Sequence, residues 1–172
     1  FALLGVFAAA MSGVIWAVFV DWSDGQIARR MSGRSESARQ FGGQLDSLID
    51  IVSFGVCPAL VLLSYGDFEI GYLPGAILII AAGVLRLSYF NVFGLDDSSS
   101  YQGLAIDNNG IVLALLFSVE RLFDGSVFAT LLYGVVVTLA VFNVAPIKTP
   151  KLSGAWYYGI TAGTLALTVV FG

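Results

Sequence analysis

Long apolar blocks separated by short polar segments recur along the whole chain of 172 residues. Each block approaches the roughly 20 residues that an α-helix needs to cross a bilayer. The blocks lack the period-two alternation of strands, and a lipid-exposed span must satisfy its own backbone hydrogen bonds. The pattern therefore predicts an all-α, polytopic transmembrane helical bundle with six spans, at residues 1–20, 44–65, 71–93, 106–123, 126–145 and 153–172.

No polar linker and no internal repeat interrupts this series of blocks. The sequence therefore predicts a single integral-membrane domain over residues 1–172. The fourth block is the weakest of the six, because residues 111–119 are its only unbroken apolar part.

Basic residues divide the predicted connections between two sides of the membrane. Arg121 stands alone on one side, and the other seven of the eight basic residues share the opposite side: Arg29, Arg30, Arg34, Arg39, Arg86, Lys148 and Lys151. Loops rich in Lys and Arg stay in the cytoplasm. The pattern predicts a protein of the cytoplasmic membrane whose basic side faces the cytoplasm, while both chain ends face the other way. Without the weak fourth block as a span, the basic residues would no longer fall almost entirely on one side of the membrane.

Composition narrows the chemistry that the chain can perform. Apolar residues make up 58% of it and charged residues 12%, with a mean hydropathy of +0.88. The net charge of −4 is opposite to what a nucleic-acid-binding surface needs, so no nucleic-acid partner is expected. The chain has no His, and its single Cys57 can form no intrachain disulfide. Catalysis must therefore rest on carboxylates, basic groups, hydroxyls or a hard metal ion.

Four aspartates stand at the predicted cytoplasmic ends of the first two spans, where ionisable groups are costly and functional by default. Asp21 and Asp24 are three residues apart, and Asp46 and Asp50 are four apart, so each pair shares one helix face. The helices are consecutive and antiparallel, so the pairs can face each other. Because four converging carboxylates repel strongly, the arrangement predicts a bound hard divalent ion, Mg²⁺ or Mn²⁺, suited to phosphate chemistry.

Small and basic residues accompany these aspartates. Gly25 would let a bulky ligand approach the backbone, Ala28 leaves space one turn on, and Arg29 has a planar guanidinium suited to a phosphate. Gly42 and Gly43 are expected to open the start of the second helix. A lone Asp at a helix end is usually a cap or a solvated residue. Two pairs of aspartates, each pair on one helix face and with Gly and Arg between the pairs, instead favour a site for metal and phosphate at the cytoplasmic face.

The order of these residues is similar to the signature D-x-x-D-G-x-x-A-R…G-x-x-x-D-x-x-x-D of the CDP-alcohol phosphatidyltransferases. Every signature position is filled, by Asp21, Asp24, Gly25, Ala28, Arg29, Gly42, Asp46 and Asp50. The resemblance implies that the four aspartates hold two divalent ions and that Asp50 also acts as general base on the acceptor hydroxyl. The other four residues would cradle the CDP part of a CDP-lipid. The acceptor oxygen would attack the β-phosphorus, and CMP would leave.

Within that family the chain is most similar to the phosphatidylserine synthases, on residues 45–59, 85–92 and 145–151. The resemblance covers about residues 10–152 and implies serine as the acceptor. It implies CDP-diacylglycerol or an ether-lipid analogue as the donor, and a homodimer surrounded by membrane lipids. It also leads us to expect one further helix upstream of Phe1.

The acceptor side of the site is predicted from a few basic and polar residues. Arg86 is the one basic residue placed inside the cytoplasmic end of a span, where it could pair with a serine carboxylate or extend to the interface. Asn91 is a further candidate for this pocket. Lys148 and Lys151 could bind a phosphate or mark the cytoplasmic side.

Residues 103–110 depart from the Gly-Leu-Pro that serine synthases tend to carry at this point. Asp107, within that segment, could bind an ammonium group or start the fourth helix. Other acceptors therefore stay open, namely inositol phosphate, glycerol phosphate or another amino alcohol. The two phosphate-bearing acceptors are disfavoured because they need a cluster of basic residues, and only Arg86, Lys148 and Lys151 are available.

Two other classes of membrane protein use acidic sites of this kind. An intramembrane prenyltransferase grips a diphosphate with Asp and Mg²⁺, and Asp46 with Asp50 would suit it. The stretch from Asp21 to Arg29 does not fit that pattern. An ion or proton transporter would show inverted repeats and broken helices at the bilayer midplane. The spans show neither, and their carboxylates lie at the interface.

Overall fold

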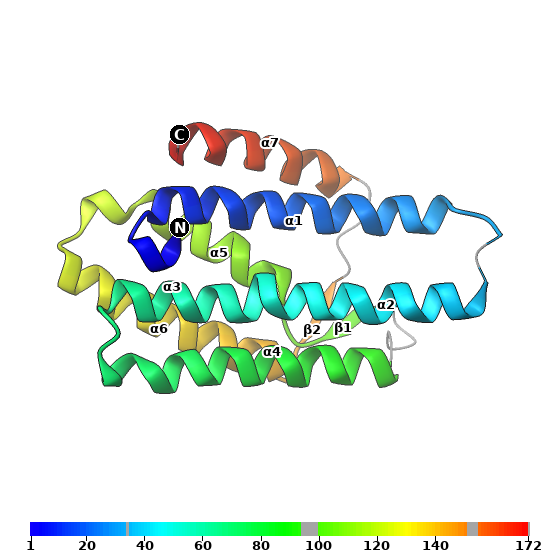
Figure 1. Ribbon diagram of the computed structural model, residues 1–172, viewed down its shortest axis with the longest axis horizontal. Helices are drawn as coiled ribbons and strands as arrows, with labels where there is room; N and C mark the ends of the chain where they lie inside the picture. Colours follow the sequence, from blue (N-terminus) through cyan, green and yellow to red (C-terminus); the bar gives the residue numbers. More distant parts are fainter. Residues whose placement is uncertain (34, 94–99, 151–154, 172) are drawn as a thin grey trace.

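Within residues 1–33, 35–93, 100–150 and 155–171, which the computed structural model describes, seven α-helices form an elongated bundle (Figure 1). The predicted all-α class is confirmed. The helices are α1 (Phe7–Arg30), α2 (Glu36–Ile51), α3 (Cys57–Tyr65), α4 (Leu73–Phe93), α5 (Asp107–Ser118), α6 (Gly125–Val144) and α7 (Ala155–Phe171). Single 3₁₀ turns precede α1, α4 and α6, at η1 (Ala2–Leu4), η3 (Ile70–Tyr72) and η4 (Glu120–Leu122).

The polar connection between α1 and α2 turns the chain back on itself. After Arg30 the backbone becomes extended at Met31, with ψ at 118°, and Gly33 adopts the left-handed conformation with φ at +81°. α2 then begins behind Ser35, whose Oγ accepts a hydrogen bond of 3.2 Å from the backbone N–H of Ala38. The two helices consequently run antiparallel to one another (Figure 1).

α2 starts earlier than the apolar pattern predicted. The second span was expected from residue 44, with Gly42 and Gly43 opening the helix start, and this expectation is wrong. Both glycines lie inside α2, because the Ser35 cap and the polar residues after it extend the helix beyond its apolar part. Asp46 and Asp50 therefore stand in the body of a helix and not at its first turn.

A π-helix, η2 (Val52–Val56), joins α2 to α3, so Glu36–Tyr65 form one continuous helix. Pro58 follows within the first turn of α3. Proline has no N–H, so Pro58 cannot donate the helical hydrogen bond to the carbonyl of Phe54, four residues earlier. The π-helix begins two residues after Asp50, and the carbonyl of Phe54 lies four residues after it. Short π-helical turns are frequent at functional sites.

The core has two parts. The larger part joins α1, α3, α4, α5 and α6 through fully buried side chains, among them Met11, Leu62, Ile79, Leu113 and Leu132. The smaller part lies nearer the aspartates and consists of Val18, Phe54, Leu87 and Ile106. It joins α1, η2, α4 and the residue before α5, and it forms the apolar base on which the polar ends of α1 and α2 rest.

Three helices of the described chain are long and apolar enough to cross a membrane. They are Glu36–Tyr65, Ile70–Phe93 and Gly125–Val144, and they match the second, third and fifth predicted spans. α1 has 24 residues but a polar last third, and α5 has only 12 residues. The two chain ends lie at one end of the bundle, and the connection from α1 to α2 lies at the other (Figure 1). This arrangement agrees with the predicted alternation of the connections between the two ends of the bundle. The long apolar helices indicate that the molecule is an integral membrane protein.

The sequence did not predict a small antiparallel ribbon. β1 (Ser100–Gln102) pairs with β2 (Lys148–Pro150), with Tyr101 opposite Thr149. Each strand has three residues, which is too short for an alternating pattern to be visible. The ribbon continues into hydrogen bonds from Gly103 N–H to the Ile147 carbonyl and from Leu104 N–H to the Phe142 carbonyl. It thereby holds the segment before α5 against the end of α6.

Candidate functional site

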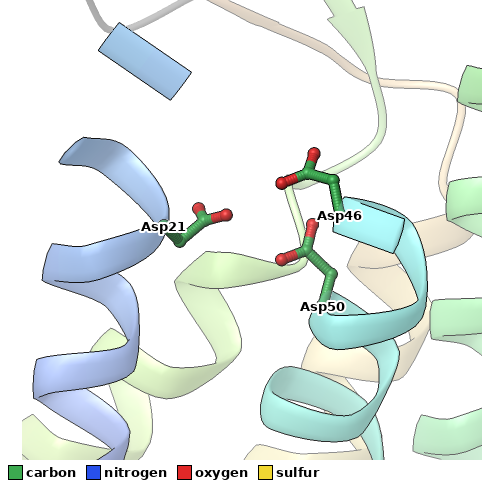
Figure 2. Close-up of side chains that lie close together, drawn as sticks. All are labelled: Asp21, Asp46 and Asp50. Atoms are coloured by element: carbon green, nitrogen blue, oxygen red, sulfur yellow. The ribbon is translucent and has the colours of Figure 1, made fainter. Parts of the chain in front are cut away.

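Three carboxylates from two helices meet at the polar end of the bundle. Asp21 projects from α1, and Asp46 and Asp50 project from α2 toward it (Figure 2). One oxygen from each residue lies within 4.8 Å of the other two. Asp21 and Asp50 are half-buried, whereas Asp46 is exposed. Carboxylate oxygens at this spacing are the donor set that a hard divalent cation prefers.

Asp24, the fourth predicted ligand, stands apart from this group. It lies on α1 three residues after Asp21, is exposed, and contributes no oxygen to the set that meets within 4.8 Å. Its charge nevertheless acts on both Asp21 and Asp46. The predicted convergence of four carboxylates is therefore seen for three, with the fourth at the solvent side.

The electrostatics of the site favour a cation. Asp21 lies just beyond the predicted first span, and burial raises its pKa from 3.8 to about 7, with the negative charges of Asp107 and Asp46 adding to the effect. Partial burial also raises the pKa of Asp24. A divalent ion would offset this repulsion and favour the charged form of the carboxyls.

Asp107 joins the site from a third helix. It is the first residue of α5, and its Oδ2 accepts a 2.7 Å hydrogen bond from Nε1–H of Trp22, the residue after Asp21. Its Oδ1 accepts from the backbone N–H and the side-chain amide of Asn108, at 3.0 and 3.2 Å. The sequence suggested an ammonium ligand or a helix start for Asp107. The structure adds that it lies near enough to Asp21 and Asp50 to influence both charges.

The predicted CDP-lipid residues occupy the same ends of α1 and α2. Gly25 and Ala28 lie on α1 and Gly42 lies on α2, and all three are half-buried. Arg29 belongs to α1, but its side chain lies outside the described part of the structure. Their role in holding a CDP-lipid stays a prediction.

Arg86 is buried, with 7% of its surface exposed, so it does not extend to the membrane interface. Its Nε donates a 3.2 Å hydrogen bond to the carbonyl of Leu104, and its guanidinium lies 5.6 Å from the centre of the Phe90 ring. The structure thus places Arg86 beside the segment 103–110, which was also predicted from the sequence to contact the acceptor.

Of the other predicted acceptor residues, the structure describes the side chain of Asn91. Nδ2 of Asn91 donates a 3.0 Å hydrogen bond to Oγ of Ser47, which is the residue after Asp46. Lys148 lies on β2, but its side chain is outside the described residues, as is the whole of Lys151. Their contribution stays a prediction.

The sequence missed two polar residues near the site. Trp22 and Asn109 received no role, although each bonds across helices. Both residues could have been noticed in the sequence, since Trp22 lies inside the aspartate motif and Asn109 is a polar residue near the start of an apolar helix.

An apolar groove of about 1040 Å³ between α5 and α6 is a separate feature. Its described lining residues, which include Val112, Thr130 and Gly134, contain no carboxylate.

Comparison with known sequences places this geometry in context. Residues 1–172 match the sequence model of the CDP-alcohol phosphatidyltransferase family. A CDP-diacylglycerol–serine O-phosphatidyltransferase of Methanocaldococcus jannaschii is 30% identical over 169 residues, which are 98% of this chain and 77% of that protein. An archaetidylserine synthase of Methanothermobacter thermautotrophicus is 32% identical over 148 residues, 85% of this chain and 60% of the relative. A serine O-phosphatidyltransferase of Helicobacter pylori strain J99 is 29% identical, with 80% of this chain and 59% of that protein covered.

Proposed function

Because the chain belongs to the CDP-alcohol phosphatidyltransferase family, as its aspartate motif predicted, we propose that it transfers a phosphatidyl group from a CDP-diacylglycerol-type lipid to the hydroxyl of L-serine. CMP is the second product. The observation that carries the proposal is the meeting of Asp21, Asp46 and Asp50 across α1 and α2, at the positions of the family signature. The names of the similar proteins support serine as the acceptor.

Divalent ions are part of the proposal, with Mg²⁺ or Mn²⁺ as candidates and two ions expected from the family. The donor set fits, because the three close oxygens are all carboxylate oxygens and the site lacks any imidazole or thiolate. Asp21, Asp46 and Asp50 would hold one ion, and Asp24 with its neighbours would complete a second. Bound ions would neutralise charge on the phosphate oxygens of the donor lipid.

Asp50 is proposed as the general base. It is half-buried, whereas Asp46 on the same helix face is exposed, so Asp50 lies deeper in the site. Its carboxylate takes the proton of the acceptor hydroxyl as the hydroxyl oxygen bonds to the β-phosphorus of the CDP-lipid. The bond from that phosphorus to the bridging oxygen breaks, and CMP carries the electron pair away.

The remaining side chains are proposed to orient the two substrates. Gly25, Ala28, Arg29 and Gly42 hold the cytidine and diphosphate of the donor. Arg86 pairs with the serine carboxylate, and its bond to the carbonyl of Leu104 supports this, because it fixes the guanidinium beside the segment 103–110. Asn91, Lys148 and Lys151 are proposed to help bind the acceptor.

The site is proposed to face the cytoplasm from the cytoplasmic membrane. Seven of the eight basic residues lie on the predicted cytoplasmic side, in connections or at the ends of spans, and the aspartates lie at that end of the helices. The long apolar helices support insertion in the bilayer. A homodimer surrounded by membrane lipids is the assembly that we propose from the family resemblance.

An ether-lipid donor is a second candidate, because one similar protein is named an archaetidylserine synthase. The test is CMP release by the protein purified in detergent with Mn²⁺. CDP-diacylglycerol and its ether analogue are each offered with serine, ethanolamine, inositol phosphate or glycerol phosphate. We expect CMP release that depends on serine, and the faster donor identifies the lipid class. Release of no CMP with any acceptor would overturn the proposed function.

A further inference from the structure

We propose that the first turn of α5, residues 107–110, is a clasp that sets the spacing between the metal-site carboxylates of α1 and α2. Asp107 and Asn109 are its positioning residues. Trp22 and the carbonyl of Phe54 are their partners. The clasp concerns the metal site of the proposed function, and its effect on helix spacing can be measured independently of catalysis.

The first contact ties α5 to α1. Nε1–H of Trp22 donates to Oδ2 of Asp107 at 2.7 Å, a short bond to a charged acceptor. Trp22 is adjacent to Asp21 in the same helix, so a restraint on its indole restrains the backbone that carries Asp21. Asn108 holds the other carboxylate oxygen of Asp107 through two bonds, which fixes the direction in which Asp107 can accept.

The second contact ties α5 to the helix that carries Asp46 and Asp50. Asn109 is fully buried, and its Nδ2 donates a 3.0 Å hydrogen bond to the carbonyl of Phe54. That carbonyl has no helical partner four residues on, because Pro58 stands there without an N–H. Phe54 follows Asp50 by one turn of continuous helix. A buried bond to a backbone carbonyl is costly to lose, so it fixes α5 firmly to this helix.

Close packing of the backbone completes the clasp. A Cβ at Gly110 would lie 2.8 Å from Cγ1 of Val14, 3.1 Å from Cδ1 of Phe54 and 3.2 Å from Cγ2 of Val18. α5 therefore touches both α1 and η2 at one residue, and only glycine allows the approach. The hydrogen bonds and this contact fall within four consecutive residues, which form one rigid helical turn.

Repulsion among the carboxylates is the reason that such a clasp matters. Asp21 on α1 and Asp46 and Asp50 on α2 would separate their helices in the absence of a cation. The clasp opposes this separation because it is bonded to both helices next to the ligands. It should preorganise the site and so strengthen ion binding, as groups that orient metal ligands typically do by about 10- to 100-fold.

The test measures Mn²⁺ binding to the full chain in detergent, without lipid or serine, from the electron paramagnetic resonance signal of free Mn²⁺. Trp22→Phe, Asp107→Ala and Asn109→Leu each remove one donor or acceptor of the clasp. We expect each to weaken binding by about tenfold or more. Asp107→Asn keeps an oxygen that can accept from Trp22, and we expect it to retain affinity within about twofold.

Asn143→Leu is the control for replacing a buried Asn by Leu away from the site, because Asn143 is also almost fully buried but lies on α6. It should leave Mn²⁺ affinity unchanged. Unchanged affinity in Trp22→Phe and Asn109→Leu would overturn the clasp. If Asp107→Asn lost as much Mn²⁺ affinity as Asp107→Ala, Asp107 would act through its charge. If Asn143→Leu lost as much Mn²⁺ affinity as Asn109→Leu, the loss would reflect a general decrease in stability. Either result would also overturn it.

A distance measurement separates the clasp from the proposed function. Spin labels at Ile27→Cys and Phe41→Cys, both at exposed positions on α1 and α2, report the helix spacing in a Cys57→Ala background without metal. Trp22→Phe and Asn109→Leu should broaden the distance distribution or shift it to longer values, and Asn143→Leu should not. This readout stands even if the protein releases no CMP. An unchanged distribution in the clasp variants would overturn the clasp.

Discussion

The carboxylate of Asp21 on α1 faces that of Asp50 on α2, with an oxygen of each within 4.8 Å of the other and of Asp46 (Figure 2). Both residues are half-buried at the polar end of an otherwise apolar bundle. Like charges at this spacing are unfavourable unless a proton or a cation lies between them. The pair therefore links the chemistry of the site to pH and to metal, and several consequences can be measured.

Substituting Asp50→Asn should abolish most of the transferase activity. The amide cannot take the proton of the acceptor hydroxyl, and a positioned general base contributes about 10²- to 10⁴-fold. CMP release from the CDP-lipid in the presence of serine measures the loss. Glu36→Gln is the control, because it removes an exposed carboxylate from the first turn of the same helix and should leave CMP release unchanged. Turnover retained in Asp50→Asn would remove Asp50 from the role of base.

The stability of the metal-free protein should fall as the pH rises. The pKa of Asp21 is raised by burial from 3.8 to about 7, so the folded protein binds this proton more tightly than the unfolded chain does. The resulting stabilisation is complete below pH 4 and is lost as the pH rises through 7. Mn²⁺ competes with the proton, so its stabilising effect should grow over the same interval.

Thermal unfolding in detergent between pH 5 and 8, with a chelator or with Mn²⁺, measures both effects. The Asp21→Asn variant lacks this titration and should show a flatter pH dependence in the chelator. A wild-type midpoint that rises with pH in the absence of metal would contradict the assignment.

Arg86→Ala should impair the use of serine more than the use of the CDP-lipid. The guanidinium is buried and bonded to the carbonyl of Leu104, so its loss would remove a fixed partner for the serine carboxylate. We expect the KM for serine to rise by at least about tenfold while the KM for the CDP-lipid changes by less than about threefold. Arg39→Ala, at an exposed position of α2, is the control. Equal increases in both KM values would point to a structural role for Arg86.

Gly110→Ala should destabilise the fold by about 1–3 kcal/mol, because a methyl group at this position would press on Val14, Phe54 and Val18. Gly13→Ala in α1 is the matched control, since among the described residues no atom outside the backbone of its own helix turn lies within 4 Å of its added Cβ, and alanine favours a helix. Thermal unfolding should therefore show a lower midpoint for the first variant and an equal or higher one for the second. Equal stability of the two would show that α5 can move away from α1 without cost.

Much of the candidate site could be predicted from the sequence, because it depends on local periodicity. The spacing of Asp21 with Asp24 and of Asp46 with Asp50 follows from helix geometry, and the antiparallel arrangement follows from the short polar connection between two apolar blocks. The family followed from the same residues and is confirmed over the whole chain. The pattern of apolar residues also predicted the helical class. It placed the start of α2 too late, because the first turns of that helix are polar and do not belong to an apolar block.

Contacts between distant parts of the chain were decided only by the tertiary structure. Trp22 and Asp107 are 85 residues apart, and Phe54 and Asn109 are 55 apart, so no local period connects them. The absence of Asp24 from the group formed by the other three carboxylates likewise depends on how α1 and α2 are placed relative to each other. The sequence by itself determined which helix faces carry charge and which chemistry they suit. Packing of a third helix against the first two decided which of those charges meet, because side chains on separate helices acquire fixed distances only when their backbones are in contact.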